Sequence, residues 1–304
     1  MAFSVERIRH LYDFQSNFLK LEDLGYHYLD EGEGEAVVML HGNPTWSFMY
    51  RDLVKALRPS YRVVVPDHIG CGLSDKPGTS EYNYTLSSRV SDLEALLTHL
   101  GLKQDLTLVV HDWGGLIGMT FAARNASAVS RIVVFNTAGF LLPAGKSLHW
   151  LLRFCKESRL AGFLIQRFNA FAIIAGYTGC RQRRIPPEIR KAYKAPYDSW
   201  ENRIATLRFV QDIPLTPRDE SYALVEETSN QLHHFREKPV LICWGEKDFV
   251  FDGSFLEEWL LRLPQAEVHS FPKGGHNIVE DASEEIVPIV IEFLAKHPLG
   301  SRTR

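Results

Sequence analysis

The sequence predicts an α/β fold in which a mostly parallel sheet is flanked by helices and interrupted by one inserted helical segment. Three observations predict it. Short apolar runs rich in β-branched residues recur along the chain, helical patterns separate them, and one long block has no strand pattern. With 304 residues, 45% of them hydrophobic, the chain can bury a large core.

Six apolar runs have the composition of strands buried on both faces of a parallel sheet. They are residues 36–40, 61–65, 106–110, 131–135, 239–244 and 266–271. Between them, apolar residues recur at helical spacing over 86–100, and a second helical pattern covers 114–125. A last helix is expected after Asp281, because Glu284 follows three residues later in the pattern of a capping box.

Residues 139–224 break this alternation, because they contain no strand-like run and are helical in pattern, aromatic and rich in basic residues. They are predicted to form a helical cap domain inserted into a core domain made of residues 1–138 and 225–304. Most of the aromatic side chains of the cap should pack the cap itself, and a few should line a pocket beneath it. These aromatic residues are Trp150, Phe154, Phe163, Phe168, Phe171, Tyr177, Tyr193, Tyr197, Trp200 and Phe209.

The overall charge and the cysteines restrict the environment and the partners. A net charge of -3 gives no excess of basic residues to pair with phosphates or anionic lipid, so neither nucleic acid nor a membrane is expected as a partner. Cys71, Cys155, Cys180 and Cys243 are scattered, which predicts reduced, largely buried thiols. The first residues lack a signal-peptide pattern and no apolar stretch approaches ~18 residues, so we expect no membrane span and a cytoplasmic location.

Two surfaces could join copies of the chain into a homo-oligomer. One is the apolar C-terminal helix, and the other is the basic cluster of Arg181, Arg183, Arg184 and Arg190. Their composition fits a core face and a solvated face more simply than an interface. The sequence therefore leaves the oligomeric state open.

Asp112 stands where a predicted buried strand ends and a helix begins, in the segment His111-Asp112-Trp113-Gly114-Gly115. The segment has the form of a nucleophile elbow, with Asp112 in the place that the G-x-S-x-G motif gives to serine. Gly114 and Gly115 supply the small residues that such a tight turn needs, whereas His111 departs from the motif. Taken alone, the segment fits equally well an aspartate that caps a helix.

Two further residues favour the nucleophile. His276 follows two glycines after the last apolar run, and Asp248 lies just beyond the run that ends at Trp244. The chain order nucleophile, acid, base is that of the α/β-hydrolase fold, which implies an eight-stranded sheet. Asp112, Asp248 and His276 are therefore predicted as the catalytic residues. Glu246 is a neighbouring alternative for the acid, and Asn136 is uncharged and cannot replace it.

A carboxylate nucleophile changes the reaction, because its attack on a saturated carbon that bears a leaving group gives an alkyl ester. The expected first step is an SN2 displacement by Asp112. In the second step His276, oriented by Asp248, would activate a water molecule that hydrolyses the ester. The backbone N–H groups of Trp113 and Asn43 are expected to hold the oxyanion.

The loop His41-Gly42-Asn43-Pro44 follows a predicted strand and should lie beside the elbow. Its glycine and proline are consistent with a plain turn. Asn43 adds a side-chain amide, which together with the indole N–H of Trp113 offers two neutral donors to a departing anion. Such donors suit a halide ion, because they bind a weakly hydrated anion without a full charge.

With these residues together, the chain resembles the haloalkane dehalogenases over nearly its whole length, and within them the third subfamily. The resemblance implies a hydrolytic dehalogenase that acts on small apolar haloalkanes with water, releases a halide ion, and uses no metal or organic cofactor. This is the first functional prediction. Asp112, Asp248 and His276 would be the catalytic residues, and Asn43 and Trp113 the halide site.

Three alternatives remain at this stage. The chain is also very similar to the β-lactone decarboxylases of bacterial long-chain olefin biosynthesis, through the elbow, the loop and segments such as 168–171 and 211–215. An epoxide hydrolase resembles it in fold and triad, and would need acidic cap tyrosines, for which Tyr193 and Tyr197 are available. A ligand receptor on the same fold is the non-enzymatic alternative, which the complete triad disfavours.

Overall fold

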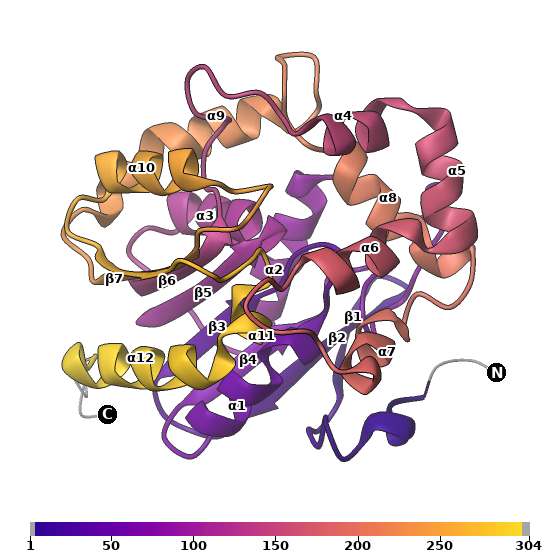
Figure 1. Ribbon diagram of the computed structural model, residues 1–304. Helices are drawn as coiled ribbons and strands as arrows, with labels where there is room; N and C mark the ends of the chain where they lie inside the picture. Colours follow the sequence, from indigo (N-terminus) through magenta and orange to yellow (C-terminus); the bar gives the residue numbers. More distant parts are fainter. Residues whose placement is uncertain (1–3, 300–304) are drawn as a thin grey trace.

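The computed structural model describes residues 4–299 and contains an eight-stranded sheet (Figure 1). The strand order is β1-β2-β4-β3-β5-β6-β7-β8, in which β2 pairs antiparallel with β1 and β4, and all other pairs are parallel. The predicted fold class is therefore confirmed. The strands are β1 Asn17–Leu21, β2 Leu24–Glu31, β3 Ala36–Leu40, β4 Arg62–Pro66, β5 Leu106–Asp112, β6 Val129–Thr137, β7 Val240–Gly245 and β8 Glu267–Phe271.

The six apolar runs correspond to β3 through β8, whereas β1 and β2 have no such run and were not predicted. Along β1 the side chains alternate between exposed and partly buried, with Phe18 and Lys20 on the exposed side. An antiparallel strand at the sheet edge needs only one buried face, so polar residues interrupt its apolar pattern.

Helices cover both faces of the sheet (Figure 1). Successive side chains of a strand point to opposite faces of the sheet. In β3, Val38 and Leu40 pack with α2 and α3, whereas Val37 and Met39 pack with α1 and α12. Continuous apolar runs are thus the consequence of two covered faces. One layer contains α1 Arg51–Leu57, α11 Ile278–Asp281 and α12 Ser283–Lys296, and the other α2 Leu86–His99, α3 Trp113–Arg124, α9 Tyr222–Gln231 and α10 Gly253–Arg262.

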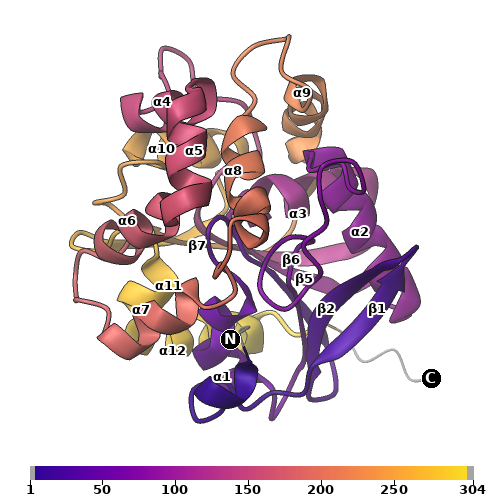
Figure 2. The same ribbon diagram turned by 90° about the vertical axis from the view of Figure 1, so that its right-hand side faces the viewer.

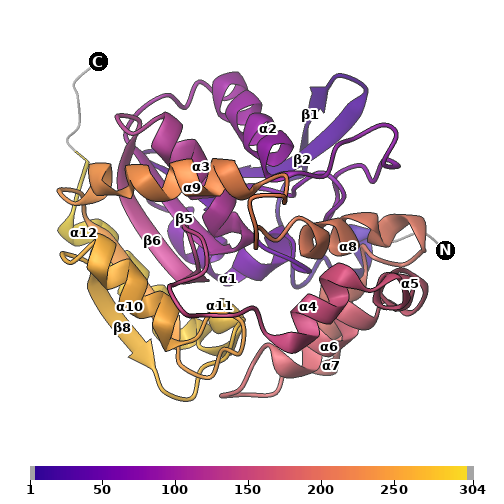
Figure 3. The same ribbon diagram turned by 90° about the horizontal axis from the view of Figure 1, so that it is seen from above.

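The predicted helical block lies between β6 and β7, and its helices gather at one end of the molecule (Figures 2 and 3). The predicted boundary at residues 224 and 225 falls inside α9, which packs against α3. The division into core and cap domains therefore stays a prediction. The helices of the block are α4 Trp150–Glu157, α5 Arg159–Phe168, α6 Ala170–Thr178, α7 Pro187–Lys194 and α8 Ile204–Gln211.

Within residues 4–299, no single helix is both long and apolar enough to cross a membrane. Helices α5 and α6 would pass that test together by length and composition, but they meet at an angle of 79°. Asn169 makes this bend, because it ends α5 in the left-handed conformation. All four cysteines are free and buried, as predicted.

A buried ion pair connects the helical block to the core. Arg51 at the start of α1 donates hydrogen bonds to both carboxylate oxygens of Glu280 in α11, at 2.7 and 3.0 Å. The hydroxyl of Tyr193 in α7 donates to the same carboxylate at 2.9 Å. Because Glu280 lies four residues after His276, this network holds α7, α1 and the loop of the predicted base in one arrangement.

We expect Arg51→Met to lower the free energy of unfolding by about 3–5 kcal/mol, because it leaves the buried Glu280 carboxylate without its hydrogen-bonded cation and only with Arg183 at 3.9 Å. Urea unfolding followed by tryptophan fluorescence measures the loss. The exposed pair of Lys20 and Asp23 provides the control, and Lys20→Ala should leave the midpoint unchanged. Equal effects of the two substitutions would contradict a structural role for the buried pair.

Candidate active site

Asp112 occupies a strained turn between β5 and α3. Its backbone has φ 49° and ψ -124°, a conformation that residues with a side chain rarely adopt. Two glycines allow the turn to approach its neighbours: a Cβ on Gly114 would collide with the carbonyl oxygen of Leu40, and a Cβ on Gly42 with the Asp112 carboxylate. The hydroxyl of Thr137 donates to the Asp112 carbonyl and fixes the turn from the next strand.

The carboxylate of Asp112 is buried and receives backbone donors. The N–H of Asn43 donates to Asp112 Oδ1 at 2.6 Å, and the backbone N–H of Trp113 also binds the carboxylate. Burial raises the pKa of Asp112, while His276 and these two N–H groups oppose the rise. The two donors predicted to hold an oxyanion therefore bind the nucleophile itself, and Oδ2 is the oxygen that faces His276 Nε2.

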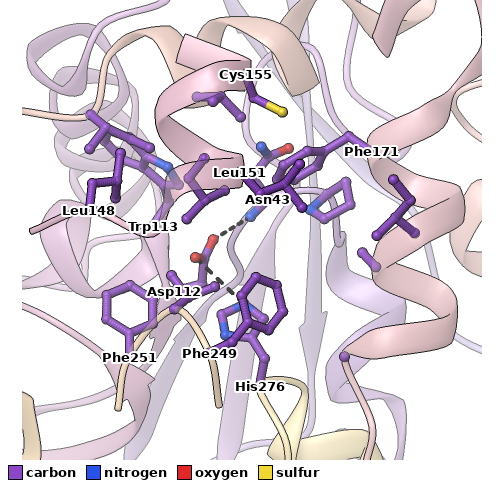
Figure 4. A pocket seen from close by; sticks show the side chains of 18 of the residues that line it. Asn43, Asp112, Trp113, Leu148, Leu151, Cys155, Phe171, Phe249, Phe251 and His276 are labelled. Carbon is purple, nitrogen blue, oxygen red and sulfur yellow. Dashed lines mark hydrogen bonds and ion pairs between the residues drawn. The ribbon is translucent and has the colours of Figure 1, made fainter. Parts of the chain in front are cut away.

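His276 lies between the two carboxylates. Its Nδ1 is 2.9 Å from Asp248 Oδ2, and its Nε2 is 3.7 Å from Asp112 Oδ2 (Figure 4). Burial by itself would lower the pKa of His276, but Asp248 and Asp112 outweigh it and raise the pKa to about 9. The structure thus brings the three predicted catalytic residues together, and the two carboxylates favour the imidazolium form of His276.

Asn136 is a part of the site that the sequence argument set aside. Its side-chain Nδ2 donates to Asp248 Oδ2 at 3.0 Å, and its Oδ1 accepts the N–H of Gly245 at 2.7 Å. The N–H of Val250 donates to the other oxygen of Asp248 at 2.7 Å. Asn136 does not replace the acid but positions it. Its location at the end of β6, next to β7, could have indicated from the sequence that it lies near Asp248.

The loop that carries His276 is held from two sides. The Nε2 atom of His111 lies 2.8 Å from the backbone carbonyl oxygen of His276. Asp281 accepts the N–H of Gly275 at 2.8 Å and also the N–H groups of residues 181–183 in the cap. The predicted capping box is therefore wrong: Asp281 ends α11 and anchors this loop, and Ala282 precedes α12.

Asn43 and Trp113 both line the cavity above Asp112 (Figure 4), but their side-chain N–H groups differ in their hydrogen bonds. The Nδ2 of Asn43 donates to the carbonyl oxygen of Thr206 at 3.0 Å, which occupies one of its two N–H bonds. The indole N–H of Trp113 has no hydrogen-bond partner among the described residues. The two donors face one cavity, and the anion that they would bind stays a prediction.

The cavity has a volume of about 240 Å³ and is lined almost entirely by apolar side chains. Helices α4, α5 and α6 form its roof, with Leu151, Ile165 and Phe171 among the lining residues. Asp112 and His276 lie at its base (Figure 4). Of the ten cap aromatics, Phe154 and Phe171 line this cavity, which agrees with the expectation that only a few would do so.

Tyr193 and Tyr197, the candidates for acidic tyrosines, do not line the cavity. The hydroxyl of Tyr193 donates to Glu280, and that of Tyr197 donates to the carbonyl oxygen of Thr45 at 2.8 Å. An epoxide oxygen above Asp112 would therefore find neither phenol, which removes the main support for an epoxide hydrolase. Within residues 4–299 no group of three or more His, Cys, Asp or Glu side chains could hold a metal ion.

The fold and the elbow define the class of protein, and comparison with known proteins agrees. The family model described as alpha/beta hydrolase fold matches residues 35–283, so the chain belongs to this family. It is an enzyme of the α/β-hydrolase superfamily. A crystal structure of the haloalkane dehalogenase DatA from Agrobacterium tumefaciens C58 covers 95% of this chain and 99% of its own with a TM-score of 0.84; at 23% identity it supports the fold alone.

Relatives of higher identity refine the comparison. A cis-3-alkyl-4-alkyloxetan-2-one decarboxylase of Shewanella oneidensis is 51% identical over 94% of this chain and 90% of its own length. A protein of the same name from Xanthomonas campestris pv. campestris is 48% identical over 90% of this chain and 93% of its own. A haloalkane dehalogenase of Mycobacterium marinum is 34% identical, with 89% of each chain covered.

The first functional prediction, a haloalkane dehalogenase, is therefore wrong. The decarboxylases are similar at 51% and 48% identity, well above the 34% of the dehalogenase. The error has a physical reason. A carboxylate nucleophile, its histidine and the neutral donors can break the carbon–halogen bond of a haloalkane and equally the carbon–oxygen bond of a β-lactone. Those residues were the basis of the prediction, and they do not distinguish the two reactions.

We expect Asp248→Asn to lower the pKa of His276 from about 9, because it removes a carboxylate that favours the imidazolium. Titration of labelled histidine by NMR measures the change, with Glu246→Gln as the control for loss of a nearby exposed charge. The stability that His276 contributes is fully present below about pH 6.5 and is lost as the pH rises through about 9. A pKa of His276 unchanged by Asp248→Asn would contradict the assigned pairing.

Proposed function

We propose that this protein is a β-lactone decarboxylase that converts a cis-3,4-dialkyl oxetan-2-one into an alkene and CO₂. The observation that carries the proposal is the position of Asp112, a carboxylate on a strained elbow at the base of an apolar cavity. The names of the relatives at 51% and 48% identity support the choice of substrate, since an oxetan-2-one is a four-membered lactone ring.

The first step opens the ring at the carbon that carries the ring oxygen. Asp112 Oδ2 attacks C4 of the lactone, the C4–O1 bond breaks, and its electron pair makes O1 part of a carboxylate. Ring strain drives this displacement, and attack from the rear inverts C4. The indole N–H of Trp113 and the free N–H of the Asn43 amide are the donors available to the new carboxylate.

The second step needs neither water nor a proton. The electron pair of the C2–C3 bond forms the C3=C4 double bond, C2 leaves with its two oxygens as CO₂, and the C4–Oδ2 pair returns to Asp112. Departure of the two groups from opposite sides, after one inversion, gives the cis alkene from the cis lactone. Atoms and charge balance without any co-reactant.

His276 acts in this scheme as a cation rather than as a base. Its pKa, raised to about 9, keeps it protonated at neutral pH, 3.7 Å from Asp112 Oδ2. The imidazolium favours the ionised nucleophile, whose pKa burial raises, and then stabilises the carboxylate of the opened ring. A protonated His276 also leaves the ester intermediate without a base that could activate water against it.

We expect the wild-type protein to release a cis alkene from a cis-3,4-dialkyl oxetan-2-one, measured by gas chromatography with mass spectrometry. Asp112→Ala should reduce the rate by at least about 10³-fold, because it removes the group that forms the covalent bond. Glu246→Gln, at an exposed neighbour of Asp248, is the matched control and should keep the rate. Bromide release from a long-chain bromoalkane without any alkene from the lactone would overturn the proposal.

The fate of water provides a second prediction. After turnover in H₂¹⁸O, mass spectrometry of the peptide with Asp112 should find no ¹⁸O, because the C4–Oδ2 bond breaks and no water attacks the ester carbonyl. His276→Phe should slow the reaction with the lactone without accumulating an alkylated Asp112. Incorporation of ¹⁸O into Asp112, or a stable adduct in the His276 variant, would indicate hydrolysis of the ester instead.

A further inference from the structure

Helices α4, α5 and α6 expose large apolar side chains. Trp150 is 71% exposed and Leu160 is 61% exposed, although both belong to residue types that are usually buried. The three helices lie side by side, because α4 packs against α5 and α5 against α6 (Figures 2 and 3). We call their exposed apolar side chains the cap apolar patch; it contains Trp150, Phe154, Leu160, Phe163, Phe168, Ile173, Ile174 and Tyr177.

The opposite faces of the same helices are fixed in the fold. Ala161 and Ile165 of α5 are buried against Leu207 and Val210 of α8, and other side chains of α4 and α6 line the cavity. These helices are therefore apolar on both sides, which in a helix of a globular protein indicates a partner on the outer side. Their inner packing means that this partner lies on the helices, and the helices do not leave the fold to meet it.

Basic residues accompany the patch. Residues 139–184 contain eight Lys or Arg and one acidic residue, although the whole chain has a net charge of -3. Arg153, Arg159 and Arg167 lie on α4 and α5 beside the patch, are exposed, and form no ion pair with any described residue. An apolar surface with aromatic side chains and flanking arginines is complementary to the interface of a bilayer that contains anionic lipids.

The cavity opens within this patch. Phe154 and Ile174 are 43% and 44% exposed, and both also line the cavity that leads to Asp112. An apolar molecule held at the patch would therefore reach the nucleophile along apolar side chains. A polar ligand would gain nothing from such an entrance, because the walls offer it few hydrogen bonds.

We propose that the cap apolar patch binds the surface of a bilayer containing anionic lipids, so that the cavity mouth faces the acyl chains. A second copy of the chain fits less well, because a two-fold contact would bring the unpaired arginines of both copies together. Exchange of substrate and alkene with the bilayer rests on the proposed function, whereas bilayer binding does not. The proposal reverses the expectation drawn from the net charge, because a sum over the chain does not record where the charges lie.

Cosedimentation with vesicles tests the proposal without any substrate. The wild-type protein should bind vesicles of phosphatidylcholine mixed with phosphatidylglycerol, and bind pure phosphatidylcholine less, with the difference reduced by salt. Trp150→Ser combined with Leu160→Ser should weaken binding about 10-fold or more, because it removes apolar area from the interface. Leu261→Ser, at a position 72% exposed on α10, is the matched control and should bind like wild type.

A second pair of variants separates charge from apolar contact. Arg153→Gln with Arg159→Gln should reduce binding to the mixed vesicles only, whereas Lys103→Gln, before β5 at the other end of the sheet, should have no effect. Thermal unfolding should give the same midpoint for all variants. Absence of wild-type binding, or equal binding by the Trp150 and Leu160 double variant, would overturn the proposal. An oligomer that this double variant dissociates, without vesicle binding, would assign the patch to a second copy.

Discussion

The structure depends on one electrostatic constraint: a carboxylate must stay ionised at the base of an apolar cavity. Burial raises the pKa of Asp112, and a protonated carboxyl group would be a poor nucleophile. The N–H of Asn43 in the loop after β3 and the N–H of Trp113 in the elbow bind the carboxylate, and His276 lies 3.7 Å away with a raised pKa. That raised pKa in turn requires Asp248, which is held by Asn136 and Val250. Thus His276 compensates for the burial of Asp112, Asp248 for that of His276, and the donors from Asn136 and Val250 for that of Asp248.

The same compensation explains why two chemistries share these residues. A haloalkane and a β-lactone both offer a saturated carbon with a leaving group, and both would form an ester with Asp112. They differ in the second step, in which one ester needs an activated water molecule and the other expels CO₂ by itself. A histidine whose pKa is raised to about 9 suits the second better than the first, because it holds its proton at neutral pH. The shared catalytic residues do not separate the two reactions, and the choice rests on the relatives of 51% and 48% identity.

The features that could be predicted from the sequence are those set by local pattern. Six strands follow from apolar runs, and the elbow follows from a strand end, an aspartate and two glycines. Strand β1 was not located, because its exposed face interrupts the apolar pattern, and β2, which lies between β1 and β4, was not located because His27, Asp30 and Glu31 interrupt its apolar residues. Asn136 and Asp281 were misjudged for another reason: their partners lie on other elements of the fold. Asn136 was set aside because it carries no charge, but its side-chain amide both donates and accepts hydrogen bonds and so joins β6 to the loop of Asp248.

The cap illustrates a further limit on inference from sequence: the net charge and composition of a chain do not show where its charged and apolar residues lie in the fold. A net charge of -3 disfavours an anionic partner for the whole chain, yet eight of its basic residues lie within residues 139–184. Likewise, the apolar residues of α4 to α6 could all have been core, but the fold turns some of them toward the cavity and others outward. Phe154 and Ile174 belong to both sets. The apolar walls of the cavity therefore have two effects. They exclude water from Asp112, and they favour the entry of apolar ligands over polar ones.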